Sequence, residues 1–334
     1  MRRWTAGLLL PLVMGAVSCA GDAAAREAAW TRFARIPGAV DVSPARGDGR
    51  LTVAAAGHLG LLRVGAAFSP FARGARGYAT ATGEPYIAVS TGARVTAARC
   101  SFARDDVYAL EPSARPGVIR VDAAGQAHRV ADLPARGFPN GIAFDGVGTF
   151  GHRLLLTSRV RSGVAALYSL DCRNRRRTVA ARIPIVEGGL VVAPRSFGRF
   201  GGQLIAPDEL SGRLIAIDAG GRARTLARSG LPAGGDIGVE SLGFAPAGLA
   251  NTVALVADRA VPGNPHPGTD TVLGVSGAAL RRAGVRPGDL LAVTEGGALT
   301  IAVRCGRRAC SVRRVAHGPA VAHAEGHIVF AARR

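Results

Sequence analysis

Short apolar runs separated by turn residues follow one another along most of this chain. The runs GIAFD, RLLLTS, AALYSLD and TVAARIP come in order after residue 140, and the next segment repeats the series as GLVVAP, QLIAPD, RLIAID and ARTLARS. Turn residues such as Asp145–Gly146 and Gly220–Gly221 lie between them. Apolar and β-branched runs of about four to eight residues bounded by such turns are typical of β-strands. The pattern predicts four strands in each of the two segments.

The third and fourth strands of these segments recur elsewhere in the sequence. VIRVDAAGQAHRVADLP, ALYSLDCRNRRRTVAARIP and LIAIDAGGRARTLARSGLP align on Asp122, Asp171 and Asp218, which are 49 and 47 residues apart. A four-stranded repeat of roughly 40–50 residues is the blade of a β-propeller. Near-continuous apolar runs, typical of an innermost strand buried on both faces, begin at six places: Ala39, Tyr86, Gly141, Gly189, Ser241 and Ala320. The sequence therefore predicts an all-β fold, a six-bladed β-propeller.

One domain, residues 29–334, accommodates this ring. The last repeat, AVAHAEGHIVFAARR, supplies only two strands, so AWTRFARIP (29–37) is predicted to complete the last blade, with one strand still unassigned. The fifth interval exceeds the repeat by a segment at about 260–289, which holds PGNPHPGTD and a short predicted helix within VSGAALRRAGVR (275–286). We interpret this segment as an insertion, because long propeller insertions form loops on one face, often the binding face.

Residues 1–19 have the features of a signal peptide. Arg2 and Arg3 precede an apolar stretch, Leu8–Val17, that is too short to span a bilayer. The tetrapeptide that ends at Cys19, AVSC, resembles a bacterial lipobox, in which this cysteine becomes the lipidated first residue. Ordinary cleavage after Ala20 is the alternative. We expect an exported protein that is lipid-anchored at the outer face of a bacterial membrane, or secreted.

Export makes the other four cysteines candidates for disulfides. Cys305 and Cys310 are close enough in sequence to close a hairpin, and Cys100 and Cys172 then pair by elimination, linking adjacent blades. A zinc site is the alternative. It is disfavoured because the chain has no CxxC pair and no histidine close in sequence to Cys100 or Cys172.

The formal net charge is +19, and every strongly basic residue is arginine. Such a charge raises the question of a polyanionic partner. The arginines are scattered, however, and no aromatic residues are interleaved with them for base stacking. We interpret them as solvated surface cations, with the densest run, Arg173–Arg177, in an exposed hairpin turn. No nucleic-acid partner is expected, and we expect a monomer.

Four oxygen-bearing side chains come directly before inner strands of consecutive blades. They are Glu84, Asn140, Glu187 and Glu240, in the contexts GEPYIAVS, FPNGIAFD, VEGGLVVAP and VESLGFAP. Since the inner strands begin around one mouth of the central channel, these side chains are predicted to converge there. Carboxylate and amide oxygens are the ligands of a hard cation such as Ca²⁺. The same residue types are also ordinary turn formers, so a purely structural role stays open.

Two further aspartates and a group of histidines complete the candidates. Asp208 and Asp258 end the second strands of neighbouring blades and are secondary candidates at the channel mouth. His323, Glu325 and His327 alternate, so a continuous strand would place them on one face. We instead predict a hairpin turn at the intervening AEG (324–326), which breaks the alternation and disfavours a metal role.

The segment FPNGIAFD resembles the Pro-Asn-Gly segment before an inner strand in the senescence marker protein/gluconolactonase family. Together with the repeat, it makes the chain similar to the six-bladed calcium-dependent propellers, including the paraoxonases and NHL-type propellers. The resemblance implies a metal held by glutamate and asparagine side chains, with Asn140 the best match and the three glutamates matching by placement. It also implies an aspartate base, but Ser158–Arg159 stands where that family has Asp-Ser after the second strand.

Two functions follow from these features. The first is a module that binds a small molecule, a glycan or an extracellular protein, with a divalent cation at the channel mouth. The alternative is a metal-dependent hydrolase of lactone or ester type. Propellers host both, and the sequence assigns no catalytic residue.

Overall fold

The computed structural model describes residues 1, 26–65, 68–72, 84–135 and 137–333. Four sheets have four strands each. In the spatial order of their strands, the first sheet contains β3 (Ala39–Val42), β4 (Leu51–Ala55), β5 (His58–Leu62) and β6 (Ser69–Pro70), and the second contains β7 (Ile87–Val89), β10 (Val107–Glu111), β11 (Gly117–Val121) and β12 (Ala127–Asp132). The third sheet contains β13 (Phe138–Phe144), β14 (Leu154–Arg161), β15 (Val164–Leu170) and β16 (Arg176–Pro184). The fourth contains β17 (Val191–Val192), β18 (Leu204–Asp208), β19 (Arg213–Ile217) and β20 (Ala223–Arg228).

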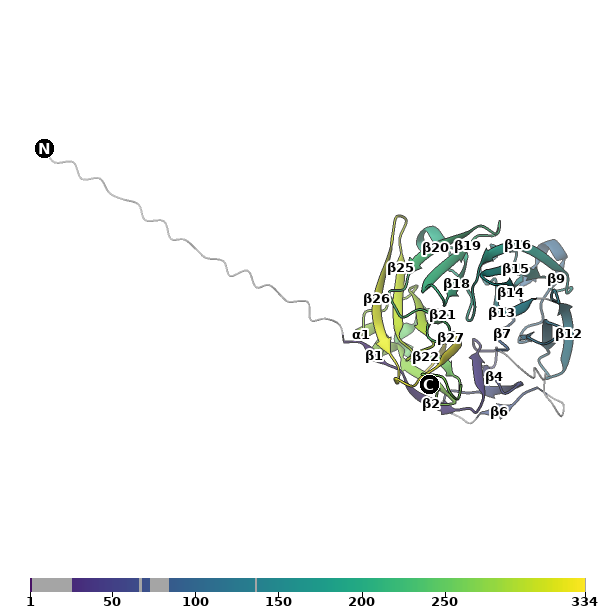
Figure 1. The fold of residues 1–334 in the computed structure, drawn as a ribbon, viewed down its shortest axis with the longest axis horizontal. Coiled ribbons are helices and arrows are strands. Elements are labelled where there is room, and N and C mark those ends of the chain that lie inside the picture. The colour runs from purple at the N-terminus through teal and green to yellow at the C-terminus, as the bar shows by residue number, and fades with distance from the viewer. Residues whose placement is uncertain (2–25, 66–67, 73–83, 136, 334) are drawn as a thin grey trace.

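The remaining large sheet has nine strands and divides in the middle. Its central strands, β21 and β27, run parallel, with Leu242 opposite His327. One half contains β21 (Val239–Phe244), β24 (Leu290–Thr294), β25 (Thr300–Cys305), β26 (Cys310–His317) and β1 (Ala28–Ala29); the other contains β27 (Ala324–Ala332), β22 (Thr252–Asp258), β23 (Thr271–Ser276) and β2 (Thr31–Arg35). Each half supplies one blade: the first has the four strands β21, β24, β25 and β26 with the two-residue β1 added at its outer edge, and the second has the four strands β27, β22, β23 and β2. With the four separate sheets they form a ring (Figure 1), so the predicted all-β propeller is confirmed.

Short elements decorate the blades. They are a two-stranded sheet of β8 (Arg94–Val95) and β9 (Cys100–Ser101), the 3₁₀ helices η1 (Thr96–Ala98), η2 (Gly198–Phe200) and η3 (Leu249–Asn251), and the helix α1 (Gly277–Arg282). The predicted short helix is therefore present, and Ser276 caps it by accepting a hydrogen bond from the main-chain N–H of Ala279. No helix in the described part of the chain is long and apolar enough to cross a membrane.

The ring is closed by both ends of the chain. Strand β2 pairs with β23, as expected for the segment 29–37, and the C-terminal β27 is the inner strand of the same blade. The predicted turn at 324–326 is wrong, because these residues belong to β27. Gly326 has a φ of +69°, which lets the strand bend without ending. The last repeat thus supplies one strand, not two.

The strands missing from the last blade come from an unexpected place. After β21 the chain crosses to the last blade, forms β22 and β23 there, and returns through α1 to complete its own blade with β24, β25 and β26. The segment 260–289 therefore includes a strand of the ring as well as a loop and a helix.

The aspartates of the sequence repeat are turn residues. Oδ1 of Asp218 accepts the main-chain N–H groups of Gly220 and Arg222, both at 3.0 Å. Asp122 and Asp171 make the same two contacts in their own hairpins. Because an aspartate can close such a turn with its own side chain, the repeat records the hairpin between the third and fourth strands of a blade.

Both expected disulfides are present. Cys100–Cys172 links β9 to the end of β15 in the next blade, and Cys305–Cys310 closes the β25–β26 hairpin. Disulfides of this kind are typical of an oxidising compartment outside the cytoplasm. The predicted signal peptide and Cys19 lie outside the described residues.

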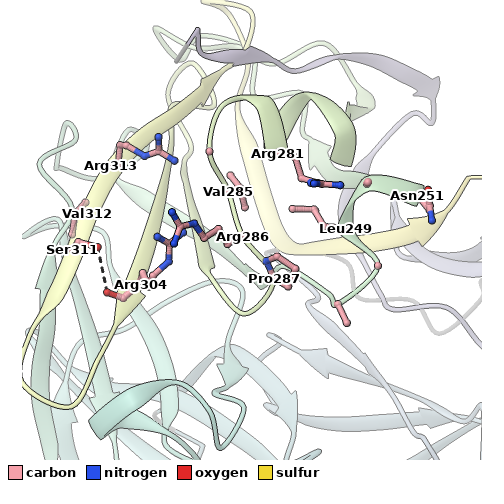
Figure 2. Close-up of a pocket in the computed structure, with 14 residues that line it drawn as sticks. Leu249, Asn251, Arg281, Val285, Arg286, Pro287, Arg304, Ser311, Val312 and Arg313 are labelled. Atoms are coloured by element: carbon pink, nitrogen blue, oxygen red, sulfur yellow. Dashed lines mark hydrogen bonds between the residues drawn. The ribbon is translucent and has the colours of Figure 1, made fainter. Parts of the chain in front are cut away.

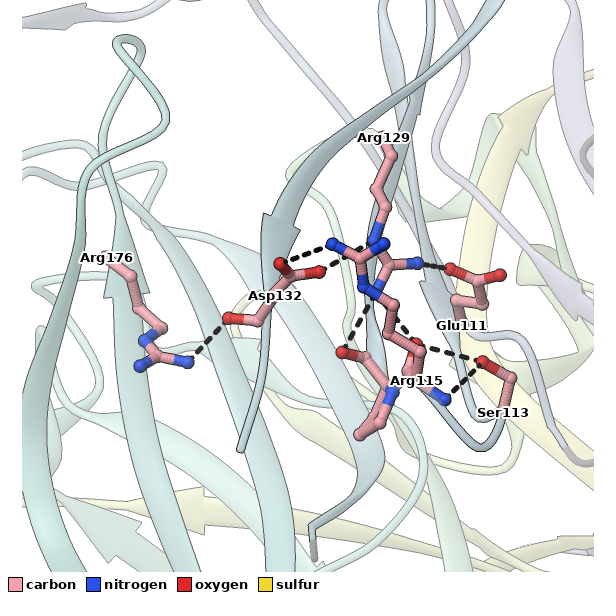
Figure 3. Close-up of polar contacts among 7 residues, drawn as sticks. Glu111, Ser113, Arg115, Arg129, Asp132 and Arg176 are labelled. Atoms are coloured by element: carbon pink, nitrogen blue, oxygen red, sulfur yellow. Dashed lines mark hydrogen bonds and ion pairs between the residues drawn. The ribbon is translucent and has the colours of Figure 1, made fainter. Parts of the chain in front are cut away.

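Arginines on the outer strands make local ion pairs. Arg129 in β12 contacts the carboxylates of Glu111 and Asp132 and the main-chain carbonyls of Arg115 and Pro116 (Figure 3). Exposed pairs of this kind contribute about 0–1 kcal/mol each. The network agrees with the interpretation of the scattered arginines as solvated surface residues.

Candidate metal and ligand site at the channel mouth

Two of the predicted residues, Asn140 and Glu240, occupy equivalent β-bulges. The register of β13 against β14 shifts between Pro139 and Gly141, and that of β21 against β24 shifts between Val239 and Ser241. A bulge leaves one residue unpaired and redirects its side chain. Both side chains are almost fully buried, at 1% exposure.

Glutamates from three blades meet at one hydroxyl group. The phenol oxygen of Tyr86 lies 2.9 Å from Oε2 of Glu84, 2.8 Å from Oε1 of Glu240 and 2.8 Å from Oε2 of Glu325. The ligand atoms that these glutamates offer lie within 4.8 Å of one another. A phenol has one proton to donate, so it can satisfy only one of the three carboxylates at a time.

Two basic side chains, Arg259 and His323, partly compensate this cluster. Nη1 of Arg259, which follows β22, contacts Glu84 and lies 3.2 Å from Oε1 of Glu325. Nε2 of His323 lies 3.4 Å from Oε1 of both Glu295 and Glu325. Burial alone would raise the pKa of Glu325, but the contacts with His323 and Arg259 outweigh it and the pKa is lowered. Glu325 is thus the anionic centre of the cluster.

At the other glutamates burial and mutual repulsion outweigh the compensation, including that of Arg259 at Glu84 and of Arg159 at Glu187. Burial, followed by repulsion from Glu325, raises the pKa of Glu84 to about 7 and that of Glu295 to about 12. Burial and the nearby Glu84 raise the pKa of Glu187 to about 8. Burial and repulsion from Glu295 raise the pKa of Glu240 well above its ordinary value. Without a bound cation, several of these groups therefore carry protons at neutral pH.

A cavity of about 260 Å³ opens beside these groups, lined by Glu84, Arg159, Ile185, Val186, Glu187, Glu209, Leu210, Gly235, Asp236, Glu240 and Glu295. Three of the four residues predicted as ligands, Glu84, Glu187 and Glu240, line it together. Asn140 lies beside the cavity, where its Nδ2 donates to the carbonyl of Val186 at 2.7 Å. The cavity is small and polar, which suits a small polar ligand.

The secondary candidates Asp208 and Asp258 are held in turns. Asp208 accepts hydrogen bonds from Ser211 and Arg213, and Asp258 accepts from Thr269 and from the main-chain N–H of His323. The residues that reach the site are the next ones along the chain, Glu209 and Arg259. A displacement of one residue along an extended chain reverses the direction of the side chain.

Two buried oxygens of the site, Oδ1 of Asn140 and Oε2 of Glu240, have no partner among the described residues. The carboxyl groups of Glu209 and Glu295 lie within hydrogen-bond reach of each other, so that a proton on one can be donated to the other. A buried polar atom without a hydrogen bond costs about 1–3 kcal/mol. A set of carboxylate and amide oxygens without partners fits a hard divalent cation. The residues present therefore fit the metal that the sequence resemblance implies.

A buried ion pair lies on the inner strands next to the cluster. Nδ1 of His327 is 2.9 Å from Oδ2 of Asp41, and its Nε2 is 3.0 Å from the carbonyl oxygen of Ile142. Because both ring nitrogens face acceptors, both must carry a proton. Burial lowers the pKa of His327, but the interaction with Asp41 outweighs it and the pKa is raised. The pair joins β27, β3 and β13 around the channel.

The sequence did not identify Tyr86, Arg259 or Glu295 as site residues. It did present His323 and Glu325 in an alternating pattern, and AEGHIVF has the same form as VEGGLVV, but both residues were set aside because 324–326 was predicted to be a turn. The other three follow no motif. Tyr86 is the first residue of an apolar run, and Arg259 and Glu295 come directly after second strands.

No protein-family model matches the chain, and no curated protein matches it. Solved structures do. Regucalcin from Agrobacterium tumefaciens strain C58, described as a calcium-binding protein, is 12% identical with a TM-score of 0.52, over 91% of this chain and 82% of that one. A gluconolactonase from Xanthomonas campestris is 12% identical with a TM-score of 0.52, over 89% and 81%. A chain of the nidogen/laminin complex is 14% identical with a TM-score of 0.50, over 88% and 85%.

These similarities define the class of fold. The chain is a β-propeller that resembles regucalcin and gluconolactonase structures, as the sequence resemblance implied. At 12% identity the likeness concerns the fold, and the chemistry of this chain has to be argued from its own residues.

Proposed function

We propose that this protein binds a divalent cation at the mouth of its channel and thereby holds a small oxygen-rich molecule in the adjoining cavity. The observation that carries the proposal is the meeting of Glu84, Glu240 and Glu325 at the single hydroxyl of Tyr86. Like charges at this spacing need protons or a cation between them. The unpartnered oxygens beside them favour the cation. Ca²⁺ is the ion that we propose, because all the donors are oxygens.

Glu84, Asn140, Glu187 and Glu240 are the residues that would hold the ion, with Glu325 as the additional carboxylate. When bound, the cation polarises an oxygen of the ligand. The hydrogen bond from Asn140 to Val186 fixes the amide so that its oxygen stays available. Arg259 holds Glu84 and Glu325 together, and Tyr86 orients whichever carboxylate accepts its proton.

Lactone or ester hydrolysis is the second candidate. Glu187 lines the cavity and has a pKa of about 8, so it can take up or release a proton close to neutral pH. For this candidate we therefore propose Glu187 as the acid–base group, and the ion would be held by Glu84, Asn140, Glu240 and Glu325 without it. The likeness to a gluconolactonase structure supports this proposal at the level of the fold.

Thermal unfolding with and without a cation tests the first proposal. Millimolar Ca²⁺ should raise the melting temperature of the wild-type protein, since a ligand that binds only the folded state stabilises it by mass action. Glu240→Gln should abolish most of that rise. Glu27→Gln is the matched control, because Glu27 lies far from the channel and pairs with Arg314. An equal response of the two variants would refute the proposal.

A lactone assay separates the two functions. Turnover of a simple γ- or δ-lactone that requires Ca²⁺ and falls at least tenfold in Glu187→Gln, while this variant keeps the Ca²⁺-induced rise in melting temperature, would establish the hydrolase. Calcium binding without turnover would favour the binding module. Because the cavity is small, we propose a small molecule as the partner of that module ahead of a glycan or an extracellular protein. Lipid anchoring through Cys19 remains part of the proposal and is tested by metabolic labelling with a palmitate analogue.

A further inference from the structure

A second, larger concavity lies at the other end of the blades from the acidic cavity. It is an open groove of about 970 Å³ between η3, the segment that follows α1, and the β25–β26 hairpin (Figure 2). Leu290, at the start of β24, is opposite Val303, and Val293, at its end, is opposite Thr300. Arg304 therefore lies beside the start of β24, whereas Glu295 follows its end. The groove and the acidic site are on opposite faces of the ring.

Four arginines and no carboxylate line this groove: Arg281, Arg286, Arg304 and Arg313. In Figure 2 the guanidinium groups of Arg286, Arg304 and Arg313 lie on the same side of the groove. Arg304 is fixed by two hydrogen bonds to the buried Asp289, at 2.7 and 2.6 Å. Asp289 thus lies behind the groove, and it already neutralises the charge of Arg304.

The other three guanidinium groups, of Arg281, Arg286 and Arg313, make no hydrogen bond or ion pair with any residue that the structure describes. Arg313 lies against Gly284, whose φ of +84° and missing Cβ leave room for the guanidinium. This differs from the outer surface of the second blade, where Arg129 and its neighbours pair with acids. The three unpaired arginines, next to the fixed Arg304, are therefore positioned to bind an anion that comes from another molecule.

The chemistry of the lining indicates the class of anion. Guanidinium groups bind phosphate oxygens through paired hydrogen bonds. The groove also exposes Val312 and Pro287, so part of the ligand can be apolar. We propose that the groove is a binding site for a phosphate-bearing ligand, either the phosphate headgroup of a membrane lipid or a soluble phosphorylated molecule.

The path of the chain favours the lipid headgroup. Glu27 pairs with Arg314, the neighbour of Arg313 in β26, and β1 then runs parallel to β26 away from the groove. The chain therefore enters the fold from the side of the groove. Cys19, the predicted lipidation site, precedes Glu27 by eight residues, which span at most roughly 28 Å. Headgroup binding here would turn the acidic cavity away from the membrane.

Vesicle and phosphate binding test the proposal and separate the two sources. The protein from residue 20 onward has no lipid but retains both disulfides and all the strands that the structure describes. It is mixed with vesicles of phosphatidylcholine, with and without 30% phosphatidylglycerol. In parallel it is titrated with inorganic phosphate and glycerol phosphate. The variant is Arg281→Glu/Arg286→Glu/Arg313→Glu. The control, Arg173→Glu/Arg177→Glu/Arg182→Glu, makes the same change of charge within and just after the densest basic run of the sequence, 173–177.

We expect the groove variant to bind the anionic vesicles at least about tenfold more weakly than wild type, because three cations that would face the anionic surface become anions, and the control to lose much less. Loss of glycerol phosphate binding in the groove variant, with no preference for anionic vesicles, would assign the groove to a soluble ligand. Equal losses in the two variants, or no binding to any probe, would overturn the proposal. The rise in melting temperature caused by Ca²⁺ should be the same in the groove variant as in wild type, so this test is independent of the acidic site.

Discussion

Replacing Glu240 with glutamine should stabilise the cation-free protein while weakening cation binding. Glu240 is 1% exposed, and its pKa is raised well above 4.5 by burial and by Glu295 and Glu325. A glutamate with a raised folded-state pKa is bound to a proton in the folded protein and ionised in the unfolded chain. Its contribution to stability therefore declines as the pH rises above the unfolded pKa. Glutamine has the same shape and carries no such penalty.

The size of the effect follows from the pH. At pH 7, the medium is 2.5 pH units above the ordinary pKa of 4.5, and each unit corresponds to about 1.4 kcal/mol. The variant should therefore be more stable than wild type by up to about 3 kcal/mol at pH 7 without a cation, and by almost nothing at pH 4.5. Chemical denaturation in EDTA at a series of pH values measures this difference. A variant that is less stable at pH 7, or a difference that does not depend on pH, would refute the reasoning.

Three other predictions concern the frame around the site. His327→Gln should destabilise the protein by about 3–5 kcal/mol at pH 6, because it leaves Asp41 buried without its partner. Since the pKa of His327 is raised in the folded protein, the ion pair stabilises most below the unfolded pKa, and the stabilities of wild type and variant should converge as the pH rises through the folded pKa. A difference in stability that stays constant with pH would contradict the ion pair. Replacing Cys100 and Cys172 by serine should cost about 4 kcal/mol, and replacing Cys305 and Cys310 about 2 kcal/mol, because the closed segments span 72 and 5 residues; denaturant midpoints in the reverse order would contradict this. Gly188→Ala should reduce calcium-induced stabilisation although it adds one methyl group, because Gly188 has a φ of +82° and a Cβ there would displace the Glu240 carboxylate; Gly230→Ala, at a φ of +69° in open space, is the control that should leave calcium binding intact.

The strands could be predicted from the sequence because each is a local pattern. Inner strands such as Gly141–Phe144 are apolar runs bounded by turns, and the repeat spacing fixes their number. The exchange of β22 and β23 into the last blade could not be predicted in this way. Those strands have the same local pattern whichever inner strand they join, and only the long-range pairing of β22 with β27 decides it.

The lining of the cavity could be predicted where it comes from acidic residues at the start of the apolar run of an inner strand. Glu84, Glu187 and Glu240 were found by that rule and do line one cavity. The residues at the ends of the second strands reach the site only if their side chains point toward the channel. At the end of β22 the sequence indicated Asp258, but the next residue, Arg259, is the one that reaches the site. Local pattern does not determine that direction at a strand end, where the alternation of the strand gives way to a turn.

An anomalous difference map from crystals of the protein soaked in Mn²⁺, as a stand-in for Ca²⁺, would test the central assignment most directly. The account predicts one strong peak at the channel mouth, within about 2.0–2.6 Å of carboxylate oxygens of Glu240 and of one or more of its neighbours. No peak there at full soaking, with Tyr86 and Arg259 still filling the space between Glu84, Glu240 and Glu325, would show that protons and arginine alone hold these carboxylates together.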